Sequence, residues 1–279
     1  MKLNQVVIGS LAFLSLSISS NLAADELAAD SYQYEVAIGQ SRLEEGPLDV
    51  NQTTIGGRYY FAPVSTLNGP RAEAAFINRS ANVFAVYQYN NIKSRWGMDI
   101  SQSASQFGGV YTDKDSDLYL SGAITNVNNT GRKVIDGSVG WYFDDNWLVK
   151  LDVEREDNDF YDDFTNIGLT SKALFKLDSG HQVNAEFGYK HFDSDRGNGA
   201  NNNYSVAGDY YLSNDLSVGL KYEWDAGGMG ENSHATTLRS NWYFNDTMAL
   251  NASYTSGSIG YSGSFAYMDS LSVGLNMRF

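Results

Sequence analysis

The chain has 279 residues, among them 27 glycines, three prolines and no cysteine, and 19 basic against 33 acidic residues give a formal net charge of −14. This balance argues against nucleic-acid binding, which needs a basic surface. The lack of cysteine excludes disulfides, thiolate zinc sites and cysteine catalysis. Three histidines are too few for a histidine-rich metal centre. We therefore expect no catalytic, cofactor-binding or metal site.

The first 24 residues are typical of a secretory signal peptide. Lys2 follows the amino terminus, an apolar run extends from Val6 to Leu16, and small and polar residues come next. The run is too short for a membrane-spanning helix, which takes about 20 residues. We expect export from the cytoplasm, cleavage after Ala23 or Ala24, and a single domain over residues 25–279.

From residue 31 onward, apolar and polar side chains alternate. In the last segment Leu271, Val273, Leu275, Met277 and Phe279 alternate with small or polar residues. A period of two places these two sets on opposite faces of a strand. The pattern predicts 14 strands, at 31–40, 51–61, 70–90, 92–112, 118–126, 132–143, 147–156, 165–177, 181–193, 204–212, 216–225, 235–244, 247–257 and 267–279. Segment 70–112 holds either two long strands or four short ones, so 12 to 16 strands remain open.

Short and long connections alternate along the chain. Short turn signals include Asp144-Asp145-Asn146, Ser213-Asn214-Asp215 and Asn245-Asp246, whereas polar segments such as 41–50, 157–164 and 194–203 are longer. Aromatic residues precede several short turns, and at one level of a barrel they would form an interfacial girdle. Together these features predict a transmembrane antiparallel up-and-down β-barrel with an apolar outside and a wet lumen.

In that arrangement the charged residues of the polar face line a pore. Acids and bases occur there in equal number, and such charges tune ion selectivity or pair across strands. Acidic connections, for example around Glu44, Asp49 and Asp157, favour a weak preference for cations. The candidate pore-lining residues are Glu35, Arg58, Asp99, Asp136, Lys150, Asp152, Glu154, Lys172, Lys176, Glu186, Lys190, Asp209, Lys221, Glu223, Arg239 and Arg278.

The chain resembles the general porins of Gram-negative outer membranes. The resemblance covers the mature chain and is carried by the signal peptide, the amphipathic strands, the terminal Phe279 and the segment Arg71-Ala-Glu-Ala-Ala-Phe-Ile-Asn-Arg79. It implies passive diffusion of small hydrophilic solutes and ions across the outer membrane. It also implies that Phe279 is an assembly signal for the barrel-assembly machinery, that lipids and lipopolysaccharide surround the protein, and that a homo-oligomer is compatible with it. No nucleic-acid partner is expected.

Three other functions remain open. A barrel with a closed lumen could act as an adhesin, a receptor or a structural anchor. An outer-membrane hydrolase could use His191 or His234, although neither has a visible third partner in the sequence. A soluble periplasmic β-sandwich is the third alternative.

Overall fold

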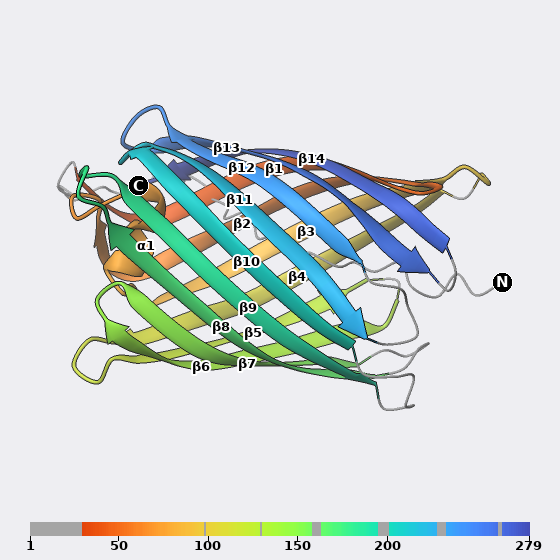
Figure 1. The fold of residues 1–279 in the computed structure, drawn as a ribbon, viewed down its shortest axis with the longest axis horizontal. Coiled ribbons are helices and arrows are strands. Elements are labelled where there is room, and N and C mark those ends of the chain that lie inside the picture. Colours follow the sequence, from red (N-terminus) through yellow and green to blue (C-terminus); the bar gives the residue numbers. More distant parts are fainter. Residues whose placement is uncertain are drawn as a thin grey trace.

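The structure is a computed structural model that describes residues 30–97, 99–128, 130–157, 163–194, 201–227, 233–261 and 264–279. Fourteen strands form one closed sheet in which consecutive strands pair antiparallel and β1 pairs with β14. This confirms the predicted 14-stranded up-and-down barrel (Figure 1). The predicted signal peptide lies outside the described residues.

The strands run from 10 to 18 residues. The first seven are β1 (Ser31–Glu45), β2 (Leu48–Ser65), β3 (Asn82–Ser94), β4 (Asp99–Asp113), β5 (Leu118–Val127), β6 (Arg132–Asp144) and β7 (Trp147–Asp157). The other seven are β8 (Phe164–Lys176), β9 (Gln182–Ser194), β10 (Asn201–Ser213), β11 (Leu216–Gly227), β12 (His234–Tyr243), β13 (Met248–Tyr261) and β14 (Ser264–Arg278).

Alternate side chains face the inside and the outside of the barrel, as the period of two requires. On β11, Val218 and Leu220 are 41% and 55% exposed, whereas Ser217 is 5% exposed. Large apolar side chains occupy the outward positions strand after strand and form an apolar belt around the barrel. None of the helices within the described ranges is both long and apolar enough to cross a membrane.

Short turns gather at one end of the barrel, which we call the short-turn end. The connections β4–β5, β6–β7, β8–β9, β10–β11 and β12–β13 lie there, together with the C-terminus. At the opposite end the predicted long loop over 41–50 was wrong, because β1 and β2 stay paired up to Glu45 and Leu48. Only Gly46 and Pro47 make that turn, and Gly46 adopts the positive φ of 54° that it requires.

The predicted strand over 70–90 was also wrong in its first half. Residues 66–81, which we call the strap, connect β2 to β3 and contain a 3-10 helix, η1 (Arg71–Glu73), followed by the single-turn α1 (Ala74–Ile77). The strap lies at the short-turn end, where α1 is seen inside the mouth (Figure 1). Its paired small and apolar residues, Ala74-Ala75 and Phe76-Ile77, interrupt the alternation that a strand needs.

An irregularity in the pairing of β1 with β2 places one proline and one tyrosine differently from the prediction. The register shifts between the pairs Tyr32–Val64 and Tyr34–Tyr59, which leaves Pro63 in the bulge of a strand and not in a turn. Such irregularities tolerate the missing N–H of proline. On β1 the pairing is irregular at the same place, since the N–H groups of Gln33 and Tyr34 both donate to the Phe279 carbonyl. Tyr32 therefore points inward and is 2% exposed, although the alternation places it on the apolar outer face.

Candidate functional site: the lumen and its strapped mouth

The strap is tied to opposite sides of the short-turn end by its two arginines. The Arg71 guanidinium lies 3.2 Å from Asp215 in the β10–β11 turn and 2.6 Å from Asp246 in the β12–β13 turn. The Arg79 guanidinium lies 2.5 Å from Asp117 before β5 and 3.1 Å from Asp145 in the β6–β7 turn. Because these two groups of turns lie almost across the barrel from each other, the strap spans the mouth.

Four buried tyrosines face inward at the short-turn end, at the level of the strap. Each is the middle residue of an aromatic or aromatic-rich triplet at the short-turn end, and each is buried, the four being Tyr60, Tyr142, Tyr211 and Tyr243. The Arg79 guanidinium lies 4.4 Å above the Tyr142 ring, and the Arg278 guanidinium lies 4.6 Å above Tyr243. The flanking residues Trp141, Phe143, Trp242 and Phe244 face outward. The expected girdle is therefore formed by the outer members of each triplet, while the middle members face the lumen.

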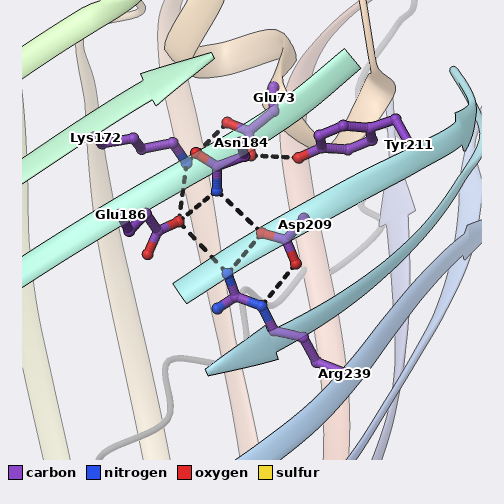
Figure 2. Close-up of polar contacts among 7 residues, drawn as sticks. All are labelled: Glu73, Lys172, Asn184, Glu186, Asp209, Tyr211 and Arg239. Atoms are coloured by element: carbon purple, nitrogen blue, oxygen red, sulfur yellow. Dashed lines mark hydrogen bonds and ion pairs between the residues drawn. The ribbon is translucent and has the colours of Figure 1, made fainter. Parts of the chain in front are cut away.

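Glu73 connects the middle of the strap to the barrel wall (Figure 2). Its carboxylate lies 2.8 Å from the Lys172 ammonium on β8 and accepts a 2.7 Å hydrogen bond from the Tyr211 hydroxyl on β10. Although Glu73 is an acid, it is only 6% exposed. A carboxylate can be buried in this way because both of its oxygens have donors.

Behind Glu73 the wall continues as a network of charges. Arg239 on β12 makes a two-pronged contact with Asp209 on β10, at 2.7 and 2.6 Å. Glu186 on β9 lies between Lys172 and Arg239, at 3.7 and 3.6 Å. The amide of Asn184 donates to both Glu186 and Asp209. Each member therefore has a partner on the wall in addition to any contact with the strap.

Most of the predicted pore-lining residues face inward and are paired. The ion pairs within the wall are Arg278–Glu35 at 2.7 Å, Lys150–Asp152 at 2.5 Å, Lys190–Glu154 at 3.1 Å and Lys221–Glu223 at 2.8 Å. Arg58 faces inward beside Glu35, where its guanidinium lies 5.5 Å from the Phe84 ring. Asp136 also faces inward and stands opposite Glu154 in the register.

Two of the predicted residues lie at the rims. Asp99 begins β4 on the outward side, since it shares the face of Ser101 and Phe107, and it accepts a hydrogen bond from Asn91. Lys176 ends β8 at the short-turn end and is exposed. Alternation itself therefore places Asp99 outside the lumen, whereas Lys176 has the inward parity but lies at the exposed end of its strand.

The inner surface has two charged sectors and a neutral one. The larger charged sector, which we call the charged side, covers β6 to β12. The smaller sector is the cluster of Glu35, Arg58 and Arg278 on β1, β2 and β14. Within the described ranges, the inward positions of β3, β4 and β5 carry amides, hydroxyls and apolar groups but no charge. The buried polar residues of this neutral side include Gln88, Asn90, Gln102, Gln106 and Thr125.

A cavity of about 340 Å³ lies beside the strap and is lined by residues of β3 to β9, so it borders both the neutral and the charged side. Ala75 and Phe76 of the strap form part of its lining, and Tyr142 and Leu148 add further apolar surface. Lys150, Lys172 and Glu186 supply its charged lining. The cavity therefore combines ring and aliphatic surface with ammonium groups.

The described contacts of His191 and His234 are with uncharged polar groups. His191 contacts the side-chain amide of Asn202 at 2.9 Å, and His234 contacts the Ser258 hydroxyl at 3.2 Å. These partners are an amide and a hydroxyl, whereas a histidine base is usually oriented by a carboxylate. Across the described segments, no group of three or more acidic or histidine side chains could hold a metal ion.

Sequence reasoning missed the strap and its anchors. The sequence places Glu73 in a predicted strand and Tyr211 in a predicted girdle, and its pattern indicates turns but no ion pairs for the aspartates of the short connections. One signal was available, since the broken alternation in Ala74-Ala75-Phe76-Ile77 lies between two arginines, Arg71 and Arg79.

The sequence matches the model of the family described as "Putative general bacterial porin" over residues 6–172 and 156–279. The chain belongs to this porin family. It therefore lies in the bacterial outer membrane.

Solved structures of outer-membrane proteins share the fold of this porin. The outer membrane protein Omp33 of Acinetobacter baumannii has 16% identity and a TM-score of 0.61, over 90% of this chain and 100% of that chain. A bacterial polysaccharide outer membrane secretin has 10% identity and a TM-score of 0.55, over 89% and 99% of the two chains. A search of curated protein sequences finds no match.

Proposed function

We propose that this porin allows small hydrophilic solutes and ions to diffuse passively through its lumen, with the strap as the narrowest point. One observation carries the proposal: a closed barrel has an apolar belt outside and a continuous polar wall inside. A wet lumen removes the penalty of several kcal/mol that each unpaired charge would bear in a dry core. No chemical step is involved, so the protein acts as a channel and not as an enzyme.

The distribution of charge supports a weak preference for cations. On the wall, most bases are neutralised by acids on the same strand or two strands away, and Asp136 adds a carboxylate that has no ion pair in the described structure. At the outer mouth, Arg42 and Arg155 neutralise part of the acidic connections around Asp49 and Asp157. The remaining acids would concentrate cations at low ionic strength.

Single-channel recording in planar bilayers with a KCl gradient tests both statements. We expect discrete current steps and a reversal potential on the side of cation preference. Insertion without any current, under all voltages, would refute passive diffusion and would support a closed barrel such as an adhesin, a receptor or a structural anchor.

The C-terminal residue supports a proposal about assembly. Phe279 accepts backbone hydrogen bonds from Gln33 and Tyr34 at the seam between β14 and β1, while its side chain stays 41% exposed. An exposed terminal aromatic on the closing strand is available to the barrel-assembly machinery before the seam forms. We propose this role for Phe279, a lipopolysaccharide contact for the outer belt, and removal of residues 1–24 on export.

A further inference from the structure

We propose that Lys172 and Tyr211 form a carboxylate-binding site that Glu73 of the strap occupies, and that a carboxylate-bearing solute loosens the strap by taking the place of Glu73. The inference rests on the proposed channel function and concerns the same mouth. It assigns a ligand class to that mouth, namely small organic anions that carry an apolar body.

The donors of this site belong to the wall, and the acceptor belongs to the strap. The Lys172 ammonium lies 2.8 Å from one oxygen of Glu73, and the Tyr211 hydroxyl donates to the other oxygen at 2.7 Å. One carboxylate thus satisfies two donors on β8 and β10 (Figure 2). A solute carboxylate in the same place would satisfy them equally, because the interaction depends on charge and geometry and not on the chain.

The wall keeps its donors in place when the strap is absent from the site. Glu186 remains beside Lys172 at 3.7 Å, and Asn184 holds Glu186 through a 2.6 Å hydrogen bond. The two hydrogen bonds from Arg239 to Asp209 fix β10, the strand that carries Tyr211. Because these residues already have partners, the site is preorganised for an incoming anion.

The cavity beside the strap gives a solute access to Lys172. Lys172 lines this cavity, whereas Glu73 does not. The Lys172 ammonium also lies 5.0 Å from the Phe76 ring, which lines the same cavity beside Tyr142. A carboxylate that arrives through the lumen therefore meets the ammonium first, and its apolar body meets aromatic surface. The volume of about 340 Å³ accommodates a monocyclic acid.

Displacement of Glu73 would loosen the middle of the strap without freeing its ends. Glu73 lies between Arg71 and Arg79, and each arginine has two aspartate partners of its own in the turns. We therefore expect a second, higher conductance level and not the complete loss of the constriction.

The test uses the mature protein in planar bilayers at fixed ionic strength, with benzoate as the anion and benzamide as its uncharged isostere. In the wild type, benzoate should raise the ratio of the time spent in the high conductance level to the time spent in the low level at least tenfold. Benzamide should leave this occupancy ratio unchanged. Glu73→Gln should populate the high level without ligand and respond less than twofold to benzoate. Glu44→Gln, a change of the same kind at the opposite end, should behave as the wild type.

A second measurement follows the strap itself. Because the chain has no cysteine, Ala75→Cys provides a unique thiol on the cavity lining, and benzoate should accelerate its modification by a soluble thiol reagent at least threefold. Block of the current by benzoate, an equal response to benzamide, or no response in a wild type that conducts would overturn the carboxylate site alone. Absence of current in the wild type and in Glu73→Gln would overturn the channel function as well.

Discussion

Replacement of Arg79 by glutamine should release one end of the strap. The ratio of the time spent in the high conductance level to the time spent in the low level should rise by about two orders of magnitude. The Arg79 side chain is 5% exposed, and its guanidinium lies 4.4 Å above the Tyr142 ring. A desolvated cation–π contact contributes about 2 kcal/mol. The two ion pairs add roughly 1 kcal/mol together, because Asp117 and Asp145 are 42% and 92% exposed. A sum of about 3 kcal/mol corresponds to a factor of about 100.

The matched control is Asp145→Asn, which removes the more exposed partner and leaves the ring contact intact. It should change the same ratio by less than about fivefold, since an exposed pair contributes at most about 1 kcal/mol. Both variants are measured in single-channel recordings at 0.1 M and 1 M KCl. An Asp145→Asn effect as large as that of Arg79→Gln, or an Arg79→Gln effect that disappears at 1 M KCl, would show that screened charge and not ring packing holds the strap.

Three further predictions concern the wall and its orientation. Arg278→Ala should lower the free energy of unfolding in lipid vesicles by about 3–5 kcal/mol, because it leaves Glu35 buried without its cation; a loss below 1 kcal/mol would contradict a buried pair. Gly219→Ala should destabilise the barrel by about 1–3 kcal/mol in the same unfolding assay, because the new Cβ overlaps the Asp209 carboxylate, whereas Gly137→Ala, where the nearest atom is 3.8 Å away, should be tolerated. Spin labels at Val218 and Lys221 should report lipid and water, respectively, in relaxation measurements; the reverse result would mean that the polar face is not the lumen.

The barrel itself could be predicted from the sequence because one physical requirement repeats on every strand. Lipid outside and water inside impose alternation, so the residues from Leu216 to Trp224 already indicate their faces. The ends of the strands were less predictable. Arg42, Glu44 and Asp49 are polar on positions that would be apolar within the belt, and the pattern therefore resembles a loop, although β1 and β2 continue their pairing there.

The strap could not be predicted in this way, because its residues answer to tertiary contacts. Glu73 is buried only because Lys172 and Tyr211 reach it from strands that lie about 100 residues or more further along the chain. The same holds for the middle tyrosines. Tyr142 and Tyr211 are residues typical of an interfacial girdle, yet both are buried inside the barrel. Alternation assigned them to the correct strands, and only the closed structure shows which partners they meet.

The position of the strap follows from the architecture of the barrel. Short turns bring their acids to a common rim, and Asp117, Asp145, Asp215 and Asp246 thereby become anchors for any basic segment that crosses the mouth. The β2–β3 connection is such a segment, with an arginine at each end and Glu73 between them. Its central carboxylate meets the charged side of the lumen, where Lys172 also faces the cavity. The strap and the charged wall are thus one connected structure, and a change in the partner of Lys172 is a change in what holds the middle of the strap in place.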